Sequence, residues 1–357
     1  MNRLEFVKGL TASMTISAFP SFGGGSDDMI WACFLPFGRN MWSDVPVPRW
    51  GRNDGSTEEK RRRLLEVCAA DHVRFDVDSF RRIAGRMREA GANTVVIDLG
   101  EALQYPSHPE LSVKGSWAPE RFRNELAWLR EIGLEPIPKL NFSTSHDLWL
   151  KEYHRMVSTR KYYEVCRDVI NDVCEIFDRP RFFHLGYDEE SAELQRYYGY
   201  CVVRQGELWW HDFLYISGLV EKQGVRPWIW SDFCWHHPED FVRRMPKSVL
   251  QSNWYYGASF DYENPKMSQY ASRAVRTYLT LEKAGFDQVP CGSDHLTDVN
   301  MPETVRFCKE RLSRERLKGF FLAPWYNGCL PAKEKMFFKA ANCLLEAKKV
   351  FSGRNET

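Results

Sequence analysis

The feature that most constrains the fold of this chain is a regular alternation of short apolar segments and amphipathic helical patterns from residue 29 onward. The apolar segments have the length and composition of buried strands. The predicted strands cover residues 29–37, 94–99, 135–140, 182–186, 226–230, 248–254, 288–292 and 319–323. The predicted helices cover residues 77–90, 119–132, 159–177, 208–222, 239–245, 268–284, 301–314 and 332–350. Eight strands that alternate with helices predict an α/β fold, a single-domain (β/α)8 TIM barrel.

Polar and aromatic side chains gather at or just after the ends of the predicted strands. The set comprises Asp98, Asn141, Asp188, Glu189, Asp232, Trp254, Asp294 and Trp325. The carboxyl ends of the strands of such a barrel meet at one face, where active sites are built. We therefore expect a single functional site at this face.

The densest polar group follows the fourth predicted strand. Gly186 permits a turn there, and Asp188, Glu189 and Glu190 follow in succession. Because burying a carboxylate costs free energy, such a group at the end of a buried strand favours chemistry over a structural loop. The alternative is the acidic first turn of a surface helix. For Glu190 alone we prefer that surface position.

Composition narrows the class of function. The chain has 357 residues and a net charge of +1, without the broad basic surface that nucleic-acid binding needs. Aromatic residues make up 14% of the chain, and their flat faces are suited to stacking on sugar rings. The ten cysteines form no Cys-x-x-Cys pair, which disfavours a structural zinc site. The aromatic content is compatible with a carbohydrate partner, although aromatic-rich cores must account for many of these residues. We expect no metal, no cofactor and no transmembrane segment, and the sequence leaves the oligomeric state open.

The N-terminal segment, residues 1–27, differs from the rest of the chain. It has a basic start, a short apolar stretch and a small-residue exit, which is typical of an export signal. It is similar to a twin-arginine signal in which Leu4 occupies the position of the second arginine. The alternative is a disordered leader. We expect export to the periplasm or cell surface, a barrel over residues 28–352, and a tail over residues 353–357.

Several motifs resemble those of family 20 glycoside hydrolases, the β-N-acetylhexosaminidases. Phe-His-Leu-Gly-Tyr-Asp-Glu at residues 183–189 is similar to the family signature His-x-Gly-Gly/Ala-Asp-Glu. Residues 133–141, with His146 beyond them, resemble the third-strand motif, a run ending in Pro-Glu-Ile-Asp before Pro-Gly-His. Residues 227–232 resemble the fifth-strand Trp-x-Asp, and Trp254 and Trp325 match the tryptophans of strands six and eight. The likeness extends in order over residues 75–330.

The resemblance implies roles for individual residues. Glu189 is expected to be the general acid/base, and Asp188 the carboxylate that orients the substrate's 2-acetamido group. A tyrosine usually shares the second role, and Tyr255, Tyr256 and Tyr326 are the alternatives. The expected substrate-binding residues are Arg39, Asn141, His146, His184, Trp230, Asp232, Trp254, Tyr255, Asp294 and Trp325.

The chain also departs from the family pattern. Tyr187 replaces a small residue, and we expect it to crowd the sugar site. Lys139 and Asn141 replace two acidic residues, and Asn327 occupies a position where the family often has glutamate. We therefore expect a divergent member of the family whose recognition of the far hydroxyl groups of the sugar differs.

The spacing of the carboxyl groups bears on the mechanism. Ordinary retaining glycosidases need two carboxyl groups about 5–5.5 Å apart, and inverting ones about 6.5–9.5 Å, on either side of the glycosidic bond. Adjacent residues are poorly placed for that arrangement, whereas substrate-assisted hydrolysis needs only one acid/base and one orienting group. We expect an exo-acting β-N-acetylhexosaminidase. The alternatives are a glycan-binding barrel without activity, and a glycosidase that pairs Glu189 with Asp98, Glu101, Asp232 or Asp294.

Overall fold

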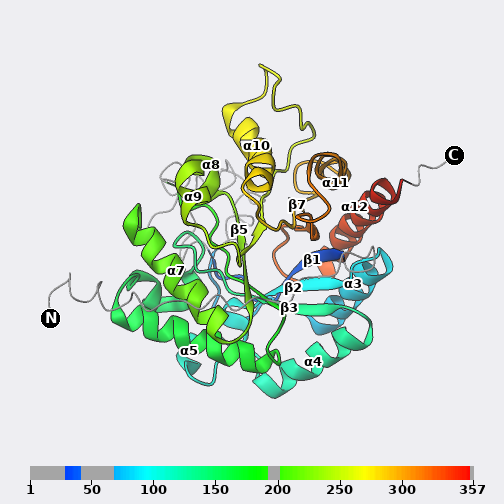
Figure 1. The fold of residues 1–357 in the computed structure, drawn as a ribbon. Helices are drawn as coiled ribbons and strands as arrows, with labels where there is room; N and C mark the ends of the chain where they lie inside the picture. The colour runs from blue at the N-terminus through cyan, green and yellow to red at the C-terminus, as the bar shows by residue number, and fades with distance from the viewer. Residues whose placement is uncertain (1–28, 42–67, 192–201, 354–357) are drawn as a thin grey trace, which may run out of the picture.

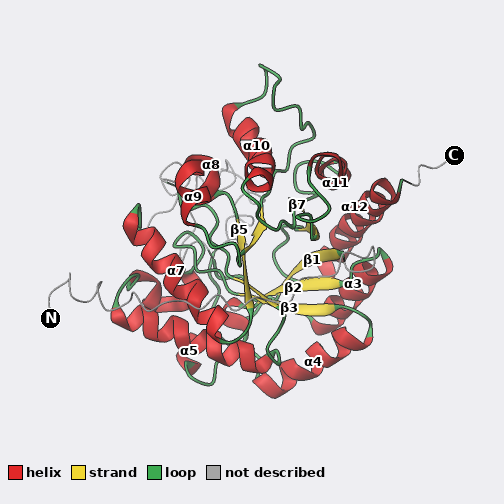
Figure 2. Cartoon of the chain, in the orientation of Figure 1, coloured by secondary structure: helices red, strands yellow, loops and turns green. Residues whose placement is uncertain are grey.

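The computed structural model describes residues 29–41, 68–191 and 202–353, and eight parallel strands form one sheet at its centre (Figures 1 and 2). The strands are β1 (Ile30–Pro36), β2 (Thr94–Asp98), β3 (Glu135–Lys139), β4 (Phe182–His184), β5 (Arg226–Trp230), β6 (Leu250–Ser252), β7 (Cys291–Gly292) and β8 (Gly319–Leu322). Their order in the sheet is β6-β5-β4-β3-β2-β1-β8-β7. Strand β1 therefore lies between β2 and β8, as it does in a barrel.

The remaining edges of the sheet, β6 and β7, are joined by two isolated parallel bridges. They pair Gln251 with Gln288 and Trp254 with Cys291. The amide of Val289 donates to the carbonyl of Gln251, and that of Cys291 donates to the carbonyl of Asn253, both at 2.8 Å. The sheet is thus nearly closed on itself, and the predicted (β/α)8 barrel is confirmed.

Helices surround the strands (Figure 2). They are α3 (Val77–Glu89), α4 (Pro119–Glu131), α5 (Arg160–Ile176), α7 (Glu207–Lys222), α8 (Phe233–His236), α9 (Pro238–Arg244), α10 (Gln269–Lys283), α11 (Asn300–Arg311) and α12 (Glu334–Ser352). Local signals explain several starts: the side chains of Asp76, Thr159 and Ser268 accept hydrogen bonds from the first turns of α3, α5 and α10. Proline opens α4 and α9, where its missing N–H costs nothing.

Most of the strands are shorter than predicted, above all the fourth, the seventh and the sixth, which covers Leu250–Ser252 against the predicted 248–254. The fourth ends at His184 because Gly186 adopts a left-handed conformation with φ of 75°. The seventh shrinks to Cys291–Gly292, since Pro290 within the predicted range has no N–H to donate to the sheet. In addition, the short helix predicted at 239–245 begins one residue earlier and is preceded by α8.

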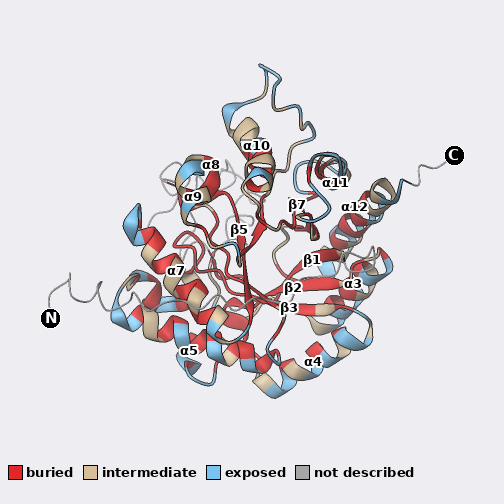
Figure 3. Cartoon of the chain, in the orientation of Figure 1, coloured by how far each residue is buried: buried red, intermediate tan, exposed pale blue. Residues whose placement is uncertain are grey.

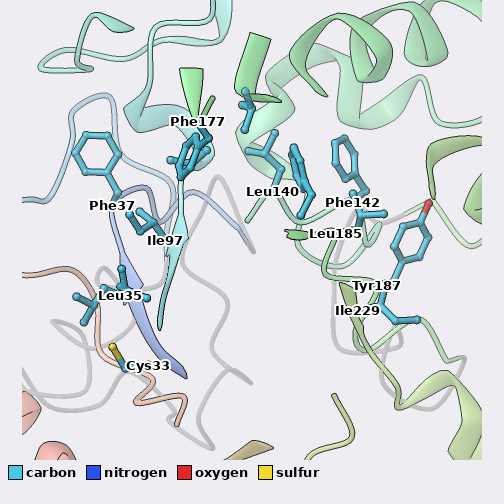
Figure 4. Close-up of a cluster of buried hydrophobic side chains, with 14 of the residues drawn as sticks. Cys33, Leu35, Phe37, Ile97, Leu140, Phe142, Phe177, Leu185, Tyr187 and Ile229 are labelled. Carbon is cyan, nitrogen blue, oxygen red and sulfur yellow. The ribbon is translucent and has the colours of Figure 1, made fainter. Parts of the chain in front are cut away.

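Alternating side chains of the strands fill two apolar layers. On β1, Ile30, Ala32 and Phe34 point into the barrel, whereas Trp31, Cys33 and Leu35 pack toward the helices. Figure 4 shows part of the outer layer, with Cys33, Leu35, Phe37 and Tyr187 labelled. Figure 3 shows the matching pattern on the helices, whose buried residues face the strands. Since both of their faces are buried, strands such as β1 and β8 consist of continuous apolar residues.

The inner layer ends in a cap of three aromatic residues at the carboxyl ends of the strands. Trp254, Tyr256 and Trp325 are only partly buried and pack on the inner cluster. This cap forms one side of the face where the polar residues were expected.

The segment expected to direct export, residues 1–27, lies outside the described residues and stays a prediction. In the part of the chain that the structure describes, no helix has the length and apolar character needed to cross a membrane. Helix α12 ends at Ser352, one residue before the tail expected at 353–357.

Candidate active site

The loop after β4 places Asp188 and Glu189 at the end of the barrel in an unusual backbone conformation. Three of its residues have left-handed φ angles: Gly186 (75°), Tyr187 (67°) and Glu189 (61°). At Gly186 a Cβ would lie 1.9 Å from Oδ1 of Asn141, so only glycine fits. For residues other than glycine this conformation costs about 1–3 kcal/mol each and persists only where the surroundings hold it. Such strain is concentrated at functional sites.

Neighbouring loops supply the groups that hold this turn. Asn141 Oδ1 accepts from the amide of Tyr187 at 3.3 Å, and Asp232 Oδ2 accepts from the amide of Glu189 at 2.8 Å. The hydroxyl of Ser143 donates to the carbonyl of Asp188 at 2.5 Å, and that of Ser145 donates to the carbonyl of Glu189 at 3.0 Å. Loops after β3 and β5 therefore fix the loop after β4 from two sides.

Asp188 is buried as an anion. Its Oδ1 accepts from Asn141 Nδ2 at 2.8 Å, and its Oδ2 lies 3.3 Å from His146 Nε2. Burial alone would raise its pKa. The charge and hydrogen bond of His146, with the charge of Lys139 and the amide of Asn141, instead hold the pKa of Asp188 below its ordinary value. Asp188 is thus ionised throughout the neutral range.

His146 contacts both carboxyl groups with one nitrogen. Its Nε2 lies 3.0 Å from Glu189 Oε2 as well as 3.3 Å from Asp188. Burial alone would lower the pKa of His146, but the two carboxyl groups raise it to about 10. The imidazole is therefore protonated near neutral pH. Of the three side chains Glu189 is the most accessible, at 26% exposed against 11% for Asp188 and 3% for His146.

Asp232 is the third carboxyl group of the site, and it is buried, at 3% exposed. Its Oδ2 accepts from the Glu189 amide, and its Oδ1 accepts from Trp254 Nε1 at 3.1 Å. Burial, and then the charge of Asp188, raise the pKa of Asp232 to about 8 in spite of these hydrogen bonds. At neutral pH Asp232 is therefore mainly protonated and Asp188 is ionised.

The aromatic cap lies beside these groups. The rings of Trp254 and Tyr256 stack with centroids 5.1 Å apart, and Trp325 meets Tyr256 edge-on at 6.5 Å. Trp230, expected to bind substrate, is 1% exposed and stacks on Phe321 at 5.1 Å. Trp230 thus belongs to the inner layer beneath the cap.

The structure distinguishes the three tyrosine alternatives. Tyr255 points to the outer layer, where its ring packs on Phe260 at 5.2 Å. Tyr326 also belongs to the outer side, and its hydroxyl bonds to Asp294. Only Tyr256 of the three faces inward, near enough to Asp188 for their charges to interact. The structure therefore does not bring Tyr255, an expected substrate-binding residue, to the carboxyl groups, because one step along an extended segment reverses the direction of a side chain.

His184 lies below the site. It is fully buried, accepts a hydrogen bond from the amide of Gly186 at 3.1 Å, and packs against Trp230 at 4.6 Å. Burial, with the positive charge of Lys139, keeps the pKa of His184 well below its ordinary value. Because its side chain is fully buried and accepts from the Gly186 amide, we assign it to the support of the turn.

Arg39 and Lys139 line another part of the barrel end. Lys139 Nζ donates to Asp98 at 2.6 Å in a buried ion pair, and Arg39 Nη2 donates to Asn327 at 3.3 Å. Burial lowers the pKa of Arg39 to about 10, although the charge of Asp98 opposes this. The structure thus brings Asn141, His146, Asp188, Glu189, Asp232 and Trp254 into one contact network, with Trp325 and Tyr256 beside it. Asp294 is tied to Tyr326 on the outer side.

Tyr187 does not crowd this site. Its ring points into the outer layer (Figure 4), where it meets Phe213 edge-on at 5.0 Å and Trp209 at 5.7 Å. The left-handed backbone at Tyr187 turns the side chain away from the barrel end. The expectation from the family pattern is therefore wrong.

Glu190 is not the surface residue expected from the sequence. Its side chain is fully buried and forms an ion pair with Arg204 at 2.8 Å. It also accepts from the amide of Thr144 at 2.6 Å and from the indole of Trp209 at 2.5 Å. Arg204 in turn pairs with Asp212 at 3.0 Å. Arg204 is 14 residues away from Glu190 in the chain, so no local sequence pattern reveals the ion pair.

Among the described residues no group of three or more His, Cys, Asp or Glu side chains is arranged to hold a metal ion.

Glu190→Ala is expected to destabilise the protein strongly, because it leaves Arg204 buried with one of its two carboxylate partners. Breaking a buried ion pair costs about 3–5 kcal/mol. The free energy of unfolding in urea measures the effect. The matched control is Arg160→Ala, which removes an exposed pair with Glu164 and should cost at most about 1 kcal/mol. Equal, small losses in both variants would contradict the structural role of Glu190.

No family model and no curated protein sequence matches the chain. Solved structures do match its barrel. Dispersin B is 14% identical with a TM-score of 0.50, covering 76% of this chain and 94% of its own. A family 20 exo-β-N-acetylglucosaminidase from Vibrio harveyi, solved with N-acetylglucosamine, is 16% identical with a TM-score of 0.56; 78% of this chain matches 52% of that one.

A β-N-acetylhexosaminidase from Bacteroides fragilis is 12% identical with a TM-score of 0.56, covering 88% of this chain and 65% of its own. This chain therefore spans about half to two thirds of the two longer enzymes. At such low identity the likeness establishes a shared fold. The predicted resemblance to the barrel of family 20 glycoside hydrolases is confirmed in that sense.

Proposed function

We propose that this chain is a glycosidase, an exo-acting β-N-acetylhexosaminidase that hydrolyses N-acetylhexosamine-containing glycans with retention of configuration. The observation that carries the proposal is the joint contact of Asp188 and Glu189 with one nitrogen of His146, beside the aromatic cap. The shared fold with family 20 structures, one of them holding N-acetylglucosamine, supports it.

The contact geometry favours substrate assistance. Asp188 and Glu189 are adjacent residues that contact the same imidazole nitrogen, an arrangement poorly suited to an acid and a nucleophile on either side of a glycosidic bond. In the proposed mechanism the carbonyl oxygen of the substrate's 2-acetamido group attacks the anomeric carbon. Glu189 donates a proton to the departing oxygen and later removes one from the attacking water.

Asp188 is proposed to stabilise the charge that develops on the acetamido nitrogen during ring closure. Its low pKa keeps it ionised for this task. His146 holds Asp188 and Glu189 in position, and Asn141 occupies the other oxygen of Asp188. Tyr256 is proposed to donate a hydrogen bond from its hydroxyl group to the acetamido oxygen, because burial raises the pKa of Tyr256 and keeps its hydroxyl protonated.

Trp254 and Trp325 are proposed to stack on the apolar face of the sugar. At the other end of the site, Arg39 and Asn327 are proposed to contact the far hydroxyl groups, with Asn327 in place of a glutamate. This replacement is the feature that favours the second candidate, a barrel that binds glycans without cleaving them.

A screen of aryl substrates tests the function directly. We expect hydrolysis of aryl N-acetyl-β-hexosaminides and little hydrolysis of aryl β-hexosides that lack the acetamido group. A thiazoline that mimics the cyclised intermediate should inhibit competitively. Equal cleavage of both substrate classes would favour a glycosidase with a second carboxylate, and binding without cleavage would favour the glycan-binding barrel.

The different roles proposed for Glu189 and Asp188 predict that variants of the two residues respond differently to the leaving group of the substrate. Glu189→Gln removes the proton donor and should lower kcat by about 10²–10⁴-fold. The loss should shrink with a dinitrophenyl substrate, whose leaving group departs without protonation. Asp188→Asn should keep its loss with either leaving group, since it weakens charge stabilisation in the transition state. Identical responses of the two variants to the leaving group would contradict the assignment.

Export is proposed from the composition of residues 1–27. Expressed in its own host, the protein should be recovered outside the cytoplasm without its first ~25 residues, a length typical of signal peptides. N-terminal sequencing of each cell fraction measures this, and an intact N-terminus in the cytosol would contradict it.

A further inference from the structure

The carboxyl group of Asp232 connects two parts of the site that come from different strands. It follows β5 directly, and its oxygens accept from the main-chain amide of Glu189 (2.8 Å) and the indole of Trp254 (3.1 Å). Asp232 is also the residue at the N-cap of α8, a position where aspartate usually caps its own helix. Its side chain makes no such capping bond and reaches across to the neighbouring loops instead. Asp232 is 3% exposed.

The bond to Glu189 acts on a strained residue. With φ of 61°, Glu189 has a left-handed backbone conformation, which residues other than glycine adopt only at a cost in free energy. If φ returned to the usual negative range, the Cα–Cβ bond would change direction and the carboxyl group would leave Nε2 of His146. Within the described residues, the amide of Glu189 donates to Asp232 and its carbonyl accepts from Ser145. Asp232 thus fixes the amide of Glu189, on the N-terminal side of the strained residue.

The bond to Trp254 has a second consequence. The indole ring could otherwise rotate about its side-chain torsions, since Trp254 is only partly buried. Its N–H is held by Asp232, while its face packs against Tyr256 and Trp235. The direction of the aromatic cap and the direction of Glu189 therefore depend on the same carboxyl group.

We propose that Asp232 is a positioning residue for the reaction. One of its oxygens holds the general acid Glu189 in its left-handed conformation, and the other orients the stacking ring of Trp254. The proposal rests on the proposed function for the role of Glu189. It replaces the expectation that Asp232 binds the sugar, because its oxygens are engaged by protein N–H groups.

The charges around Asp232 give it a measurable signature. Asp232 faces Asp188 and Glu189 from the loop after β4. The positively charged His146, from the loop after β3, lies beyond these two residues. The neutral indole of Trp254, from the segment after β6, contacts Asp232 directly. Its pKa of about 8 means that its charge changes in a range where Asp188 stays ionised and His146, with a pKa of about 10, is mostly protonated. An amide that donates to a carboxyl group reports its ionisation through a shift in resonance frequency.

The first experiment needs no substrate. The full chain is labelled with ¹⁵N-glutamate, and the Glu189 amide is assigned by its absence from the spectrum of Glu189→Gln. In the wild type this resonance should titrate with a midpoint near pH 8. In Asp232→Asn, which keeps the shape but does not ionise, that step should vanish. An unchanged titration in Asp232→Asn would overturn the contact on which the proposal rests, because the step would then arise from another group.

The second experiment tests the consequence for catalysis. Asp232→Ala is expected to lower kcat with a methylumbelliferyl substrate by about 10- to 100-fold, part of what positioned acid catalysis supplies. The loss should be smaller with a dinitrophenyl substrate, which needs no proton. Trp254→Phe is the matched control: it removes the indole N–H and part of the stacking ring, leaves the bond from the Glu189 amide to Asp232 in place, and should affect both substrates by the same factor.

The outcomes separate positioning from a general loss of structure. Equal losses of Asp232→Ala with both leaving groups, or no loss at all, would overturn the proposal. A wild type that hydrolyses no N-acetylhexosaminide would refute the proposed function, and the NMR titration would then still decide whether Asp232 holds the Glu189 peptide. Circular dichroism of each variant establishes that it is folded before kinetics are measured.

Discussion

The contact of a protonated His146 with Asp188 and Glu189 is the interaction on which the rest of the site depends. Two adjacent carboxyl groups at a mostly buried position carry a desolvation cost and repel each other. The imidazolium offsets both effects, since its one nitrogen lies within 3.3 Å of each. Without it, Asp188 would lose the largest of the interactions that lower its pKa, and Glu189 would lose its contact with Nε2 of His146.

The same turn sorts its side chains between two environments. Asp188 and Glu189 face the end of the barrel, whereas Tyr187 and Glu190 enter the outer layer. There Glu190 joins Arg204 and Asp212 in a buried network that also holds the amide of Thr144. Because Thr144 belongs to the loop that carries His146, the outer network supports the inner one. A loop that carries strain is thus held from both of its faces.

Lys139 and Asn141, two residues that differ from the family 20 pattern, influence the charge of the site. Where the family pattern has acidic residues, this chain has Lys139 and Asn141. Lys139 pairs with Asp98 inside the barrel, and its charge lowers the pKa of both His184 and Asp188. Asn141 neutralises no charge, but its amide donates to Asp188 and its oxygen accepts from the turn. The substitutions therefore act on the same carboxylate, one through charge and the other through hydrogen bonding.

The sequence by itself determined the barrel and the face on which its polar residues gather. Strand and helix periods are local properties, and the carboxyl ends of parallel strands meet at one face whatever the details. It did not determine the direction of side chains in the irregular segments after the strands. Tyr255 and Tyr256 differ by one position, yet only the second faces the site, and the distinction depends on how far β6 extends. Side chains alternate in direction along an extended segment, so Tyr256 is expected to share the direction of Trp254; this was the one sequence signal that could have distinguished Tyr256 from Tyr255.

Long-range pairing was decided only by the tertiary structure. Glu190 looks like the exposed start of a helix, and its burial depends on Arg204, which the fold brings to it. The bonds of Asp232 to Glu189 and Trp254 likewise join residues that follow three different strands, and Asp232 lies 22 or more positions from each of its partners. The free energy of a buried charge depends on its partners in space, so its role becomes visible only when those partners are in place.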